Sequence, residues 1–305
     1  MRKVYFRADA SPTIGYGHFI RSLALADMLR SHFDCTIFTC SPTDEQVSQT
    51  EGICRLVSLS GESAQSGQFL EMLDGTQTVV LDNYFYTSDY EKAVKDKGCS
   101  LVSIDDMHDR HFFADAVINH GFSHEDSYSR EDYTRLCLGP QWALLRRPFL
   151  EARRDHSPAG EMSRVAICFG GGDPLGLSAR FAEALSKRAE ISEIRTVLGM
   201  SGKLTASQMA ELFSWCDLAV VSMSSVCLEA LACGAAVAAG WYVDNQKEGY
   251  DNFTARNMIY GLGYLGNGIP DTEEIIKTIS KTALSPSPID GKGIRERYIE
   301  LFKTL

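Results

Sequence analysis

Residues 3–30, KVYFRADASPTIGYGHFIRSLALADMLR, predict a strand, a glycine-containing turn and a helix in direct succession. The strand is expected over Lys3–Arg7, where β-favouring residues cluster, and the helix over Phe19–Arg30, where apolar residues recur with helical spacing. Gly15 and Gly17 permit the tight turn between them. A strand followed at once by a helix with an apolar face is the opening unit of a parallel α/β sheet.

The same alternation runs through the rest of the chain and predicts an α/β fold with two Rossmann-like domains. Further short strands, each followed by polar residues, are expected at residues 35–40, 78–81, 101–104 and 116–118, and then at 164–169, 195–198, 218–221 and 237–241. The polar stretch 153–163, which contains Pro and Gly, predicts a linker. We expect an N-terminal domain over 1–152, a C-terminal domain over 164–285, and a helix over 286–305 that packs back on the first domain. Two such halves would place a ligand between the carboxyl ends of their sheets, in a central cleft.

Composition excludes several classes of function. The 305 residues carry a formal net charge of −10, which argues against a broad nucleic-acid surface, although helix N-termini can still bind a phosphorylated metabolite. Nine cysteines without a C-x-x-C pair indicate reduced, buried thiols. The start of the chain turns polar too early for a signal peptide, and no window reaches the ~18 apolar residues of a membrane span. We therefore expect a cytoplasmic protein, monomeric, with no membrane partner.

Two strand-to-helix junctions in the second half are candidate diphosphate sites. The stretch FGGGDP, residues 169–174, places Gly171 and Gly172 where a backbone could approach an anion at a helix start. A turn that merely needs positive φ explains the same glycines. No Gly-Lys-Ser/Thr follows, so a Walker site is excluded.

The second junction is SMSSVCLEALACG, residues 222–234. Ser224 and Ser225 can cap the helix or hold phosphate, and Glu229, about one helical turn later, can accept both hydroxyls of a ribose. Glu229 could instead be a solvated residue on the helix face, but its apolar neighbours argue against that interpretation.

His18 follows the Gly15–Gly17 turn and falls in the first turn of the predicted helix. The positive end of the helix disfavours the imidazolium ion, which leaves a neutral base near pH 7. A histidine at such a position is commonly structural. Because a nucleotide site is predicted in the other half, we interpret His18 as catalytic; Asp9, Asp82 and His120 are the alternative bases.

These motifs resemble those of known families. The second half, with GGGD, S-x-S-S-x-x-x-E-A-x-x-x-G and VDNQ (243–246), resembles the UDP-binding domain of GT-B glycosyltransferases, among them the N-acetylglucosaminyltransferase that makes lipid II. The first half is similar to the UDP-2,4-diacetamido-2,4,6-trideoxy-β-L-altropyranose hydrolases of pseudaminic acid synthesis. The stretches that carry this similarity are FRADASPTIGYGHFIRSLALA (6–26), LDNY (81–84), SIDDMHDRHFFADAVIN (103–119) and GPQWALLRRPF (139–149).

The resemblance implies a GT-B fold and a role for each matching residue. His18 matches the histidine that activates water. The implied substrate-binding residues are Gly15, Gly17, Arg21, Tyr84, Asn245 and Gln246, and the implied UDP-binding residues are Gly171, Gly172, Ser224, Ser225 and Glu229. The chain departs from the hydrolases at Asn83, His120 and Trp142, where histidine, glutamine and tyrosine are usual, which leaves the identity of the sugar open.

The function expected from these residues is hydrolysis of a UDP-linked diacetamido or amino-deoxy sugar in nonulosonic acid or surface-polysaccharide synthesis, without cofactor or metal. Two alternatives remain: a GT-B glycosyltransferase with a UDP-sugar donor, and a non-catalytic nucleotide-sugar-binding protein. The cluster Asp82, Asp105, Asp106 and His108 imitates a metal site, but we expect these residues to cap loops after parallel strands.

Overall fold

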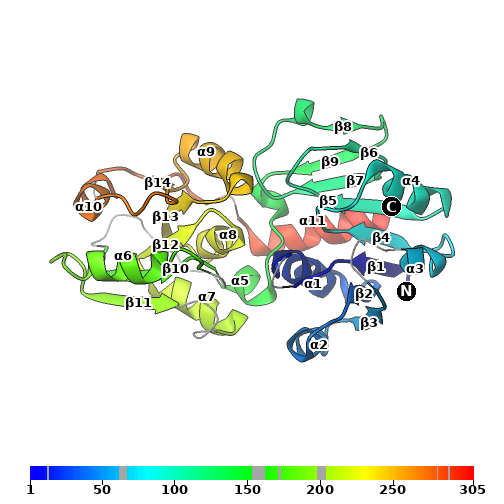
Figure 1. The fold of residues 1–305 in the computed structure, drawn as a ribbon, viewed down its shortest axis with the longest axis horizontal. Helices are drawn as coiled ribbons and strands as arrows, with labels where there is room; N and C mark the ends of the chain where they lie inside the picture. Colours follow the sequence, from blue (N-terminus) through cyan, green and yellow to red (C-terminus); the bar gives the residue numbers. More distant parts are fainter. Residues whose placement is uncertain are drawn as a thin grey trace. The chain divides into compact units, whose positions relative to one another are not determined.

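The computed structural model describes residues 1–11, 14–61, 67–152, 162–170, 173–197, 204–279, 281–287 and 289–305. The chain forms two compact units (Figure 1): unit 1 comprises Met1–Arg147 and Lys292–Leu305, and unit 2 comprises Pro148–Gly291. Of the predicted linker 153–163, residues 153–161 lie outside the described part of the chain. Within the described residues, no helix is both long and apolar enough to span a membrane.

Unit 1 is built on a seven-stranded parallel sheet in the order β3-β2-β1-β4-β5-β7-β9. The strand order reverses direction between β1 and β4, the type of position where open α/β sheets bind ligands. The strands are β1 (Lys3–Arg7), β2 (Asp34–Cys40), β3 (Arg55–Leu59), β4 (Thr78–Leu81), β5 (Ser100–Ile104), β7 (Ala116–Asn119) and β9 (Arg135–Leu138). A separate two-stranded pairing joins β6 (His111–Phe112) and β8 (Ser129–Arg130).

The inner strands of unit 1 are largely buried, as expected for a parallel sheet covered on both faces. Every residue of β4 and of β7 is buried. A hydrophobic cluster that includes Phe69, Val79, Leu101 and Phe112 fills the space beside the sheet. The covering helices are α1 (Gly17–Leu29), α2 (Asp44–Thr50), α3 (Gly67–Glu71), α4 (Ser88–Asp96) and α11 (Gly291–Thr304), with 3₁₀ turns η1 (Glu125–Ser127) and η2 (Pro140–Trp142).

Helix α11, the last element of the chain, lies beside α1 (Figure 1). The ring of Phe302 packs edge-on against Phe33, just after α1, with centroids 6.1 Å apart. The hydroxyl of the buried Tyr298 donates to the carbonyl oxygen of Trp142 at 2.5 Å. Phe33 and Phe302, from opposite ends of the chain, thus share one core.

Unit 2 repeats the architecture with a five-stranded parallel sheet in the order β11-β10-β12-β13-β14. Its strands are β10 (Arg164–Cys168), β11 (Glu193–Val197), β12 (Leu218–Ser222), β13 (Ala236–Trp241) and β14 (Tyr260–Tyr264). Its helices are α5 (Arg147–Glu151), α6 (Leu177–Leu185), α7 (Ala206–Trp215), α8 (Ser225–Ala232), α9 (Lys247–Ala255) and α10 (Thr272–Ile279), with a 3₁₀ turn η4 (Asp244–Gln246). A core that includes Ile167, Phe181, Val220 and Leu265 packs between the sheet and its helices.

Candidate active site

The turn before α1 places His18 at the carboxyl edge of the unit 1 sheet. Gly15 has a φ of +86°, a backbone conformation that other residues rarely adopt, and its amide donates to the Ser11 carbonyl oxygen at 2.7 Å. At Gly17 a Cβ atom would meet nothing within 4 Å and φ is not positive, so the fold itself does not require glycine there. His18, the second residue of α1, is buried.

Asp82, the first residue after β4, joins the side chains of α1 into one cluster. Its Oδ1 lies 2.7 Å from Nδ1 of His18. Arg21, one turn along the helix, donates from Nε to Oδ2 at 2.8 Å and from Nη2 to Oδ1 at 2.6 Å. Ser22 donates its hydroxyl to Oδ2 at 3.2 Å. The carboxylate is fully buried, and these donors satisfy both of its oxygens.

The charge state of Asp82 fixes the tautomer of His18. Burial opposes ionisation of the carboxyl group, but the Arg21 guanidinium and the His18 hydrogen bond outweigh it and hold the pKa of Asp82 below its usual value. An ionised carboxylate only accepts hydrogen bonds, so Nδ1 of His18 carries the proton that it donates. Nε2 of the neutral ring then carries the lone pair. An imidazole oriented in this way by a buried carboxylate is the arrangement of a general base.

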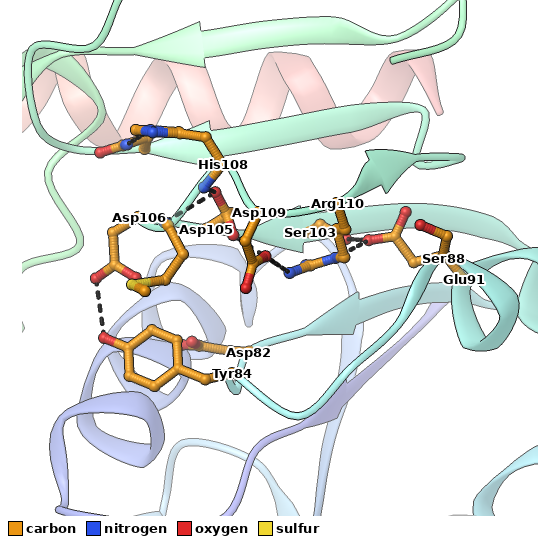
Figure 2. Close-up of polar contacts among 12 residues, drawn as sticks. Asp82, Tyr84, Ser88, Glu91, Ser103, Asp105, Asp106, His108, Asp109 and Arg110 are labelled. Atoms are coloured by element: carbon orange, nitrogen blue, oxygen red, sulfur yellow. Dashed lines mark hydrogen bonds and ion pairs between the residues drawn. The ribbon is translucent and has the colours of Figure 1, made fainter. Parts of the chain in front are cut away.

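A second carboxylate extends the cluster from the end of β5. Asp106 Oδ2 accepts from Nη1 of Arg21 and from the hydroxyl of Tyr84, each at 3.2 Å. The Tyr84 ring stands edge-on to that of His18, with centroids 4.5 Å apart. Burial opposes ionisation of Asp106, yet the charge of Arg21 lowers its pKa, so it is an anion. The predicted residues His18, Arg21 and Tyr84 therefore lie together, and Figure 2 shows the Tyr84–Asp106 contact.

Asp105, the remaining carboxylate of the cluster that imitates a metal site, has structural partners (Figure 2). Asp105 Oδ2 accepts from the amides of Met107 and His108 at 3.1 and 2.9 Å, which closes the loop after β5. Arg110 bridges Asp105 and the buried Glu91, with both nitrogen–oxygen distances 3.3 Å. No group of three or more His, Cys, Asp or Glu side chains in the described ranges is arranged to hold a metal ion.

Two of the three departures from the hydrolase pattern are part of the framework of unit 1. Asn83 is buried, and its Oδ1 accepts from the amide of Asp9 at 2.8 Å, which ties the end of β4 to the end of β1. Trp142 is buried against Tyr298 of α11, with ring centroids 5.3 Å apart. His120, the third departure, follows β7 directly.

The predicted UDP-binding residues belong to unit 2, and two of them, Gly171 and Gly172, fall outside the described residues. Ser224 is the N-cap residue of α8, and its hydroxyl lies 3.1 Å from that of Ser222. Ser225 begins the helix and is exposed, so its hydroxyl is open to a ligand. Glu229 is only 7% exposed on the apolar helix, so it is not a solvated residue of the helix face.

The remaining predicted residues of unit 2 surround two other helix starts. Helix α6 begins at Leu177, and Gly176, in the left-handed conformation, is its N-cap. The Asp173 carboxylate accepts from the amides of the first two helical residues at 2.8 and 3.0 Å. Asn245 lies exposed in η4, and Gln246 Oε1 accepts from the Tyr242 amide at 3.1 Å.

Sequence reasoning named Asp82 and His120 only as alternative bases, and Asp106 only as part of a cluster that imitates a metal site, and it did not place any of the three beside His18 and Arg21. Each nevertheless stands within two positions of the end of a buried strand, at β4, β5 and β7. Carboxyl ends of parallel strands share one edge of the sheet, so polar residues at such positions are the signal that could have found them.

Comparisons with known proteins show what this chain is similar to. The chain matches no established protein-family model. It is 24% identical over 317 residues to an uncharacterized protein of Methanocaldococcus jannaschii, a match that covers 93% of this chain but only 60% of that protein. It is 27% identical over 269 residues to the UDP-2,4-diacetamido-2,4,6-trideoxy-β-L-altropyranose hydrolase of Campylobacter jejuni, covering 80% of this chain and 93% of the hydrolase.

Solved structures establish the fold. MurG of Acinetobacter baumannii superposes with a TM-score of 0.64 at 12% identity, and each chain is covered completely. Alr3699/HepE of Anabaena, solved with UDP and glucose, superposes with a TM-score of 0.63 at 13% identity, again over both whole chains. The predicted GT-B fold with two parallel-sheet domains is confirmed. The predicted similarity to the hydrolases is confirmed as a distant one.

Proposed function

We propose that this protein hydrolyses a UDP-linked sugar, releasing UDP and the free sugar. The observation that carries the proposal is the 2.7 Å contact between Nδ1 of His18 and the buried Asp82 carboxylate, from which we infer that Nδ1 donates and that Nε2 keeps its lone pair. Binding of a nucleotide sugar requires no base, whereas activation of water does. The similarity at 27% identity to a protein named as a UDP-sugar hydrolase supports the same reaction.

In the proposed reaction, Nε2 of His18 takes a proton from water while the water oxygen forms a bond to the anomeric carbon. The bond from that carbon to the β-phosphate oxygen breaks, and its electron pair leaves with UDP. The configuration at the anomeric carbon inverts, because water attacks opposite the leaving group. Asp82 stabilises the imidazolium that forms, and Arg21 fixes the carboxylate at a distance of 2.6 Å.

We assign the nucleotide to unit 2. The exposed Ser225 at the start of α8 and the amides of that helix start favour an anion, which matches a diphosphate leaving group. We assign the buried Glu229, one turn further on, to the ribose hydroxyl groups, which a carboxylate can accept. Gly171, Gly172, Asn245 and Gln246 remain assigned to UDP or to the sugar by the resemblance alone. Gly15 and Gly17 are assigned to close backbone approach to the sugar.

The test is incubation of the purified chain with a panel of UDP-sugars in the absence of any acceptor. We expect free UDP and free sugar in equal amounts by mass spectrometry, and inverted configuration at the anomeric carbon by NMR. His18→Asn should abolish both products, whereas the matched control His32→Asn, at an exposed site, should retain full turnover. UDP release that depends on an added acceptor would identify a glycosyltransferase instead. Binding without any product would identify a nucleotide-sugar-binding protein.

A further inference from the structure

Asp106 lies two residues after β5 and contacts two residues of the candidate site, yet the proposed reaction gives it no role. Its Oδ2 accepts hydrogen bonds from Nη1 of Arg21 and from the Tyr84 hydroxyl group, each at 3.2 Å. Burial opposes its ionisation, but the charge of Arg21 lowers its pKa, so the carboxylate is an anion. A hydroxyl group donates a stronger hydrogen bond to an anion than to a neutral acceptor. Asp106 is therefore suited to hold the Tyr84 hydroxyl group in one place.

The contacts of Asp106 close a circuit of side chains around His18. The circuit begins at Asp82, whose Oδ1 lies 2.7 Å from Nδ1 of the His18 ring. Arg21 connects the two carboxylates, because it donates to Asp82 at 2.6 Å and to Asp106 at 3.2 Å. The circuit ends at Tyr84, whose ring stands edge-on to the His18 ring, with centroids 4.5 Å apart and an interplanar angle of 82°. His18 is thus contacted at Nδ1 by Asp82 and at its ring by Tyr84.

Tyr84 depends on its hydroxyl group for its orientation, because the core does not enclose it. It is 44% exposed, whereas the nearby Tyr86 is 4% exposed and belongs to the hydrophobic cluster of unit 1. An exposed aromatic side chain can adopt several rotamers. The hydrogen bond to Asp106, drawn in Figure 2, favours the rotamer in which the Tyr84 ring packs on His18. Loss of this bond should therefore loosen the contact between the two rings.

The loop that carries Asp106 is itself held by several contacts (Figure 2). The preceding residue, Asp105, accepts from the amide of His108 at 2.9 Å. Arg110 bridges Asp105 and the buried Glu91 of α4, with both nitrogen–oxygen distances 3.3 Å. His108 has a φ of +53°, a conformation that a residue other than glycine keeps where the surrounding contacts impose it. The loop therefore presents Asp106 from a well-supported backbone, as a residue that positions others requires.

We propose that Asp106 is a positioning residue for the general base, and that it acts by holding the Tyr84 ring against His18. A hydrogen bond at Nδ1 alone leaves the imidazole ring free to tilt about that bond. The Tyr84 ring limits this tilt, so that Nε2 stays aligned with the water that it deprotonates. Arg21 does not need Asp106 for its own placement, because it keeps two hydrogen bonds to Asp82. This inference rests on the proposed hydrolysis, and it adds a residue that the reaction did not use.

The first experiment measures kcat with a UDP-sugar that the wild type hydrolyses. Because a displacement of about 1 Å can cost about 10²-fold in rate, we expect Asp106→Ala to lower kcat at least tenfold, with the Kd for UDP within twofold. Asp106→Asn, whose side-chain oxygen still accepts from Tyr84, should keep kcat within threefold of the wild type. Tyr84→Phe should lower kcat as much as Asp106→Ala does, and the double variant should be no slower than either. Asp109→Ala, in the same loop with a 54% exposed carboxylate, is the matched control and should change nothing.

The second measurement follows the His18 ring and needs no turnover. In protein labelled with ¹³C at Cε1 of its seven histidines, the His18 signal is the one that His18→Asn removes. The chemical shift of an atom beside an aromatic ring depends on the orientation of that ring. We therefore expect Asp106→Ala and Tyr84→Phe to move the His18 signal and Asp109→Ala to leave it in place. Tyr84→Phe breaks the same hydrogen bond from the other side, so the test does not depend on the stability of the Asp106 variants.

A His18 signal that stays in place in Asp106→Ala and Tyr84→Phe would overturn the inference. Losses of kcat that multiply in the double variant would also overturn it, because Asp106 would then act through something besides Tyr84. The outcome is separable from that of the proposed function. A His18 signal that moves in a protein without hydrolysis refutes only the hydrolase. Hydrolysis at the wild-type rate in Asp106→Ala refutes only this role of Asp106.

Discussion

Replacement of Asp82 by asparagine tests the part of the site on which the proposed mechanism depends. An asparagine side chain has nearly the same shape, but it places an amide group where two carboxylate oxygens accepted hydrogen bonds. If its NH₂ group faces His18, it donates to Nδ1 across the present 2.7 Å contact, and the ring proton moves to Nε2. The base then has no lone pair toward water. Because general-base catalysis contributes about 10²–10⁴-fold, we expect kcat for UDP release to fall by at least a hundredfold.

The same substitution should also lower stability, since Arg21 loses the anion that it contacts at 2.6 Å. Removal of one partner of a buried ion pair costs about 3–5 kcal/mol, and the remaining contact of Arg21 with Asp106 places the expected loss near the lower figure. Urea denaturation at pH 7 measures it. Asp109→Asn is the control, because that carboxylate is 54% exposed and lies 3.5 Å from Arg110. An Asp82→Asn enzyme that keeps kcat within tenfold of the wild type would show that Asp82 does not set the state of His18.

Four further predictions follow from individual residues. His18→Asn should lower turnover at least a hundredfold and leave the Kd for UDP within twofold, as measured by a coupled UDP assay and calorimetry. Glu229→Ala should weaken UDP at least tenfold by calorimetry, because each charge-assisted hydrogen bond to ribose contributes about 1.5–3 kcal/mol; an unchanged Kd would remove it from the site. EDTA should leave turnover unchanged, since arginine and amide donors already occupy Asp82 and Asp105; a loss restored by magnesium would contradict this. The pKa of His120 in the folded protein is about 4, below its ordinary value of 6.5, so the unfolded chain binds the proton first as the pH falls. The free energy of unfolding of the wild type should therefore fall by up to about 3 kcal/mol between pH 6.5 and 4, and His120→Gln should remove this fall. Urea denaturation across this pH range measures it, and parallel profiles for the two proteins would refute the prediction.

The fold could be predicted where strands are buried on both faces. The strands β4 and β12 are continuous apolar runs because helices cover both sides of a parallel sheet. Besides the short pair β6 and β8, the strands that the sequence analysis did not predict are β3, β9 and β14, and these three lie at edges of the two main sheets. There one side faces solvent, so RLVSL and RLCL mix polar and apolar residues, and YGLGY has two glycines. The local sequence at such edges is not hydrophobic enough to indicate a strand.

The candidate site was predictable for residues near His18 in sequence and much less so for its partners. The turn-to-helix geometry of Gly15 and His18 is local, and a short window of sequence contains it. Asp82 and Asp106 contact Arg21 over separations of 61 and 85 residues, which only the order of the strands brings about. The spacing of Asp82 and Asp106 along the chain does not by itself reveal that they contact Arg21.

Because unit 1 is made of residues from both ends of the chain, the order of synthesis constrains how the protein folds on the ribosome. Unit 2 is continuous from Pro148 to Gly291, so all of its strands have been synthesised before the segment Lys292–Leu305 is made. Unit 1 must wait for that segment, since Tyr298 and Phe302 fill part of its core. A nascent chain therefore carries an incomplete first unit throughout elongation, with the surface that α11 will cover open to chaperones. A chain that ends before Lys292 would keep unit 2 whole and leave unit 1 without part of its core.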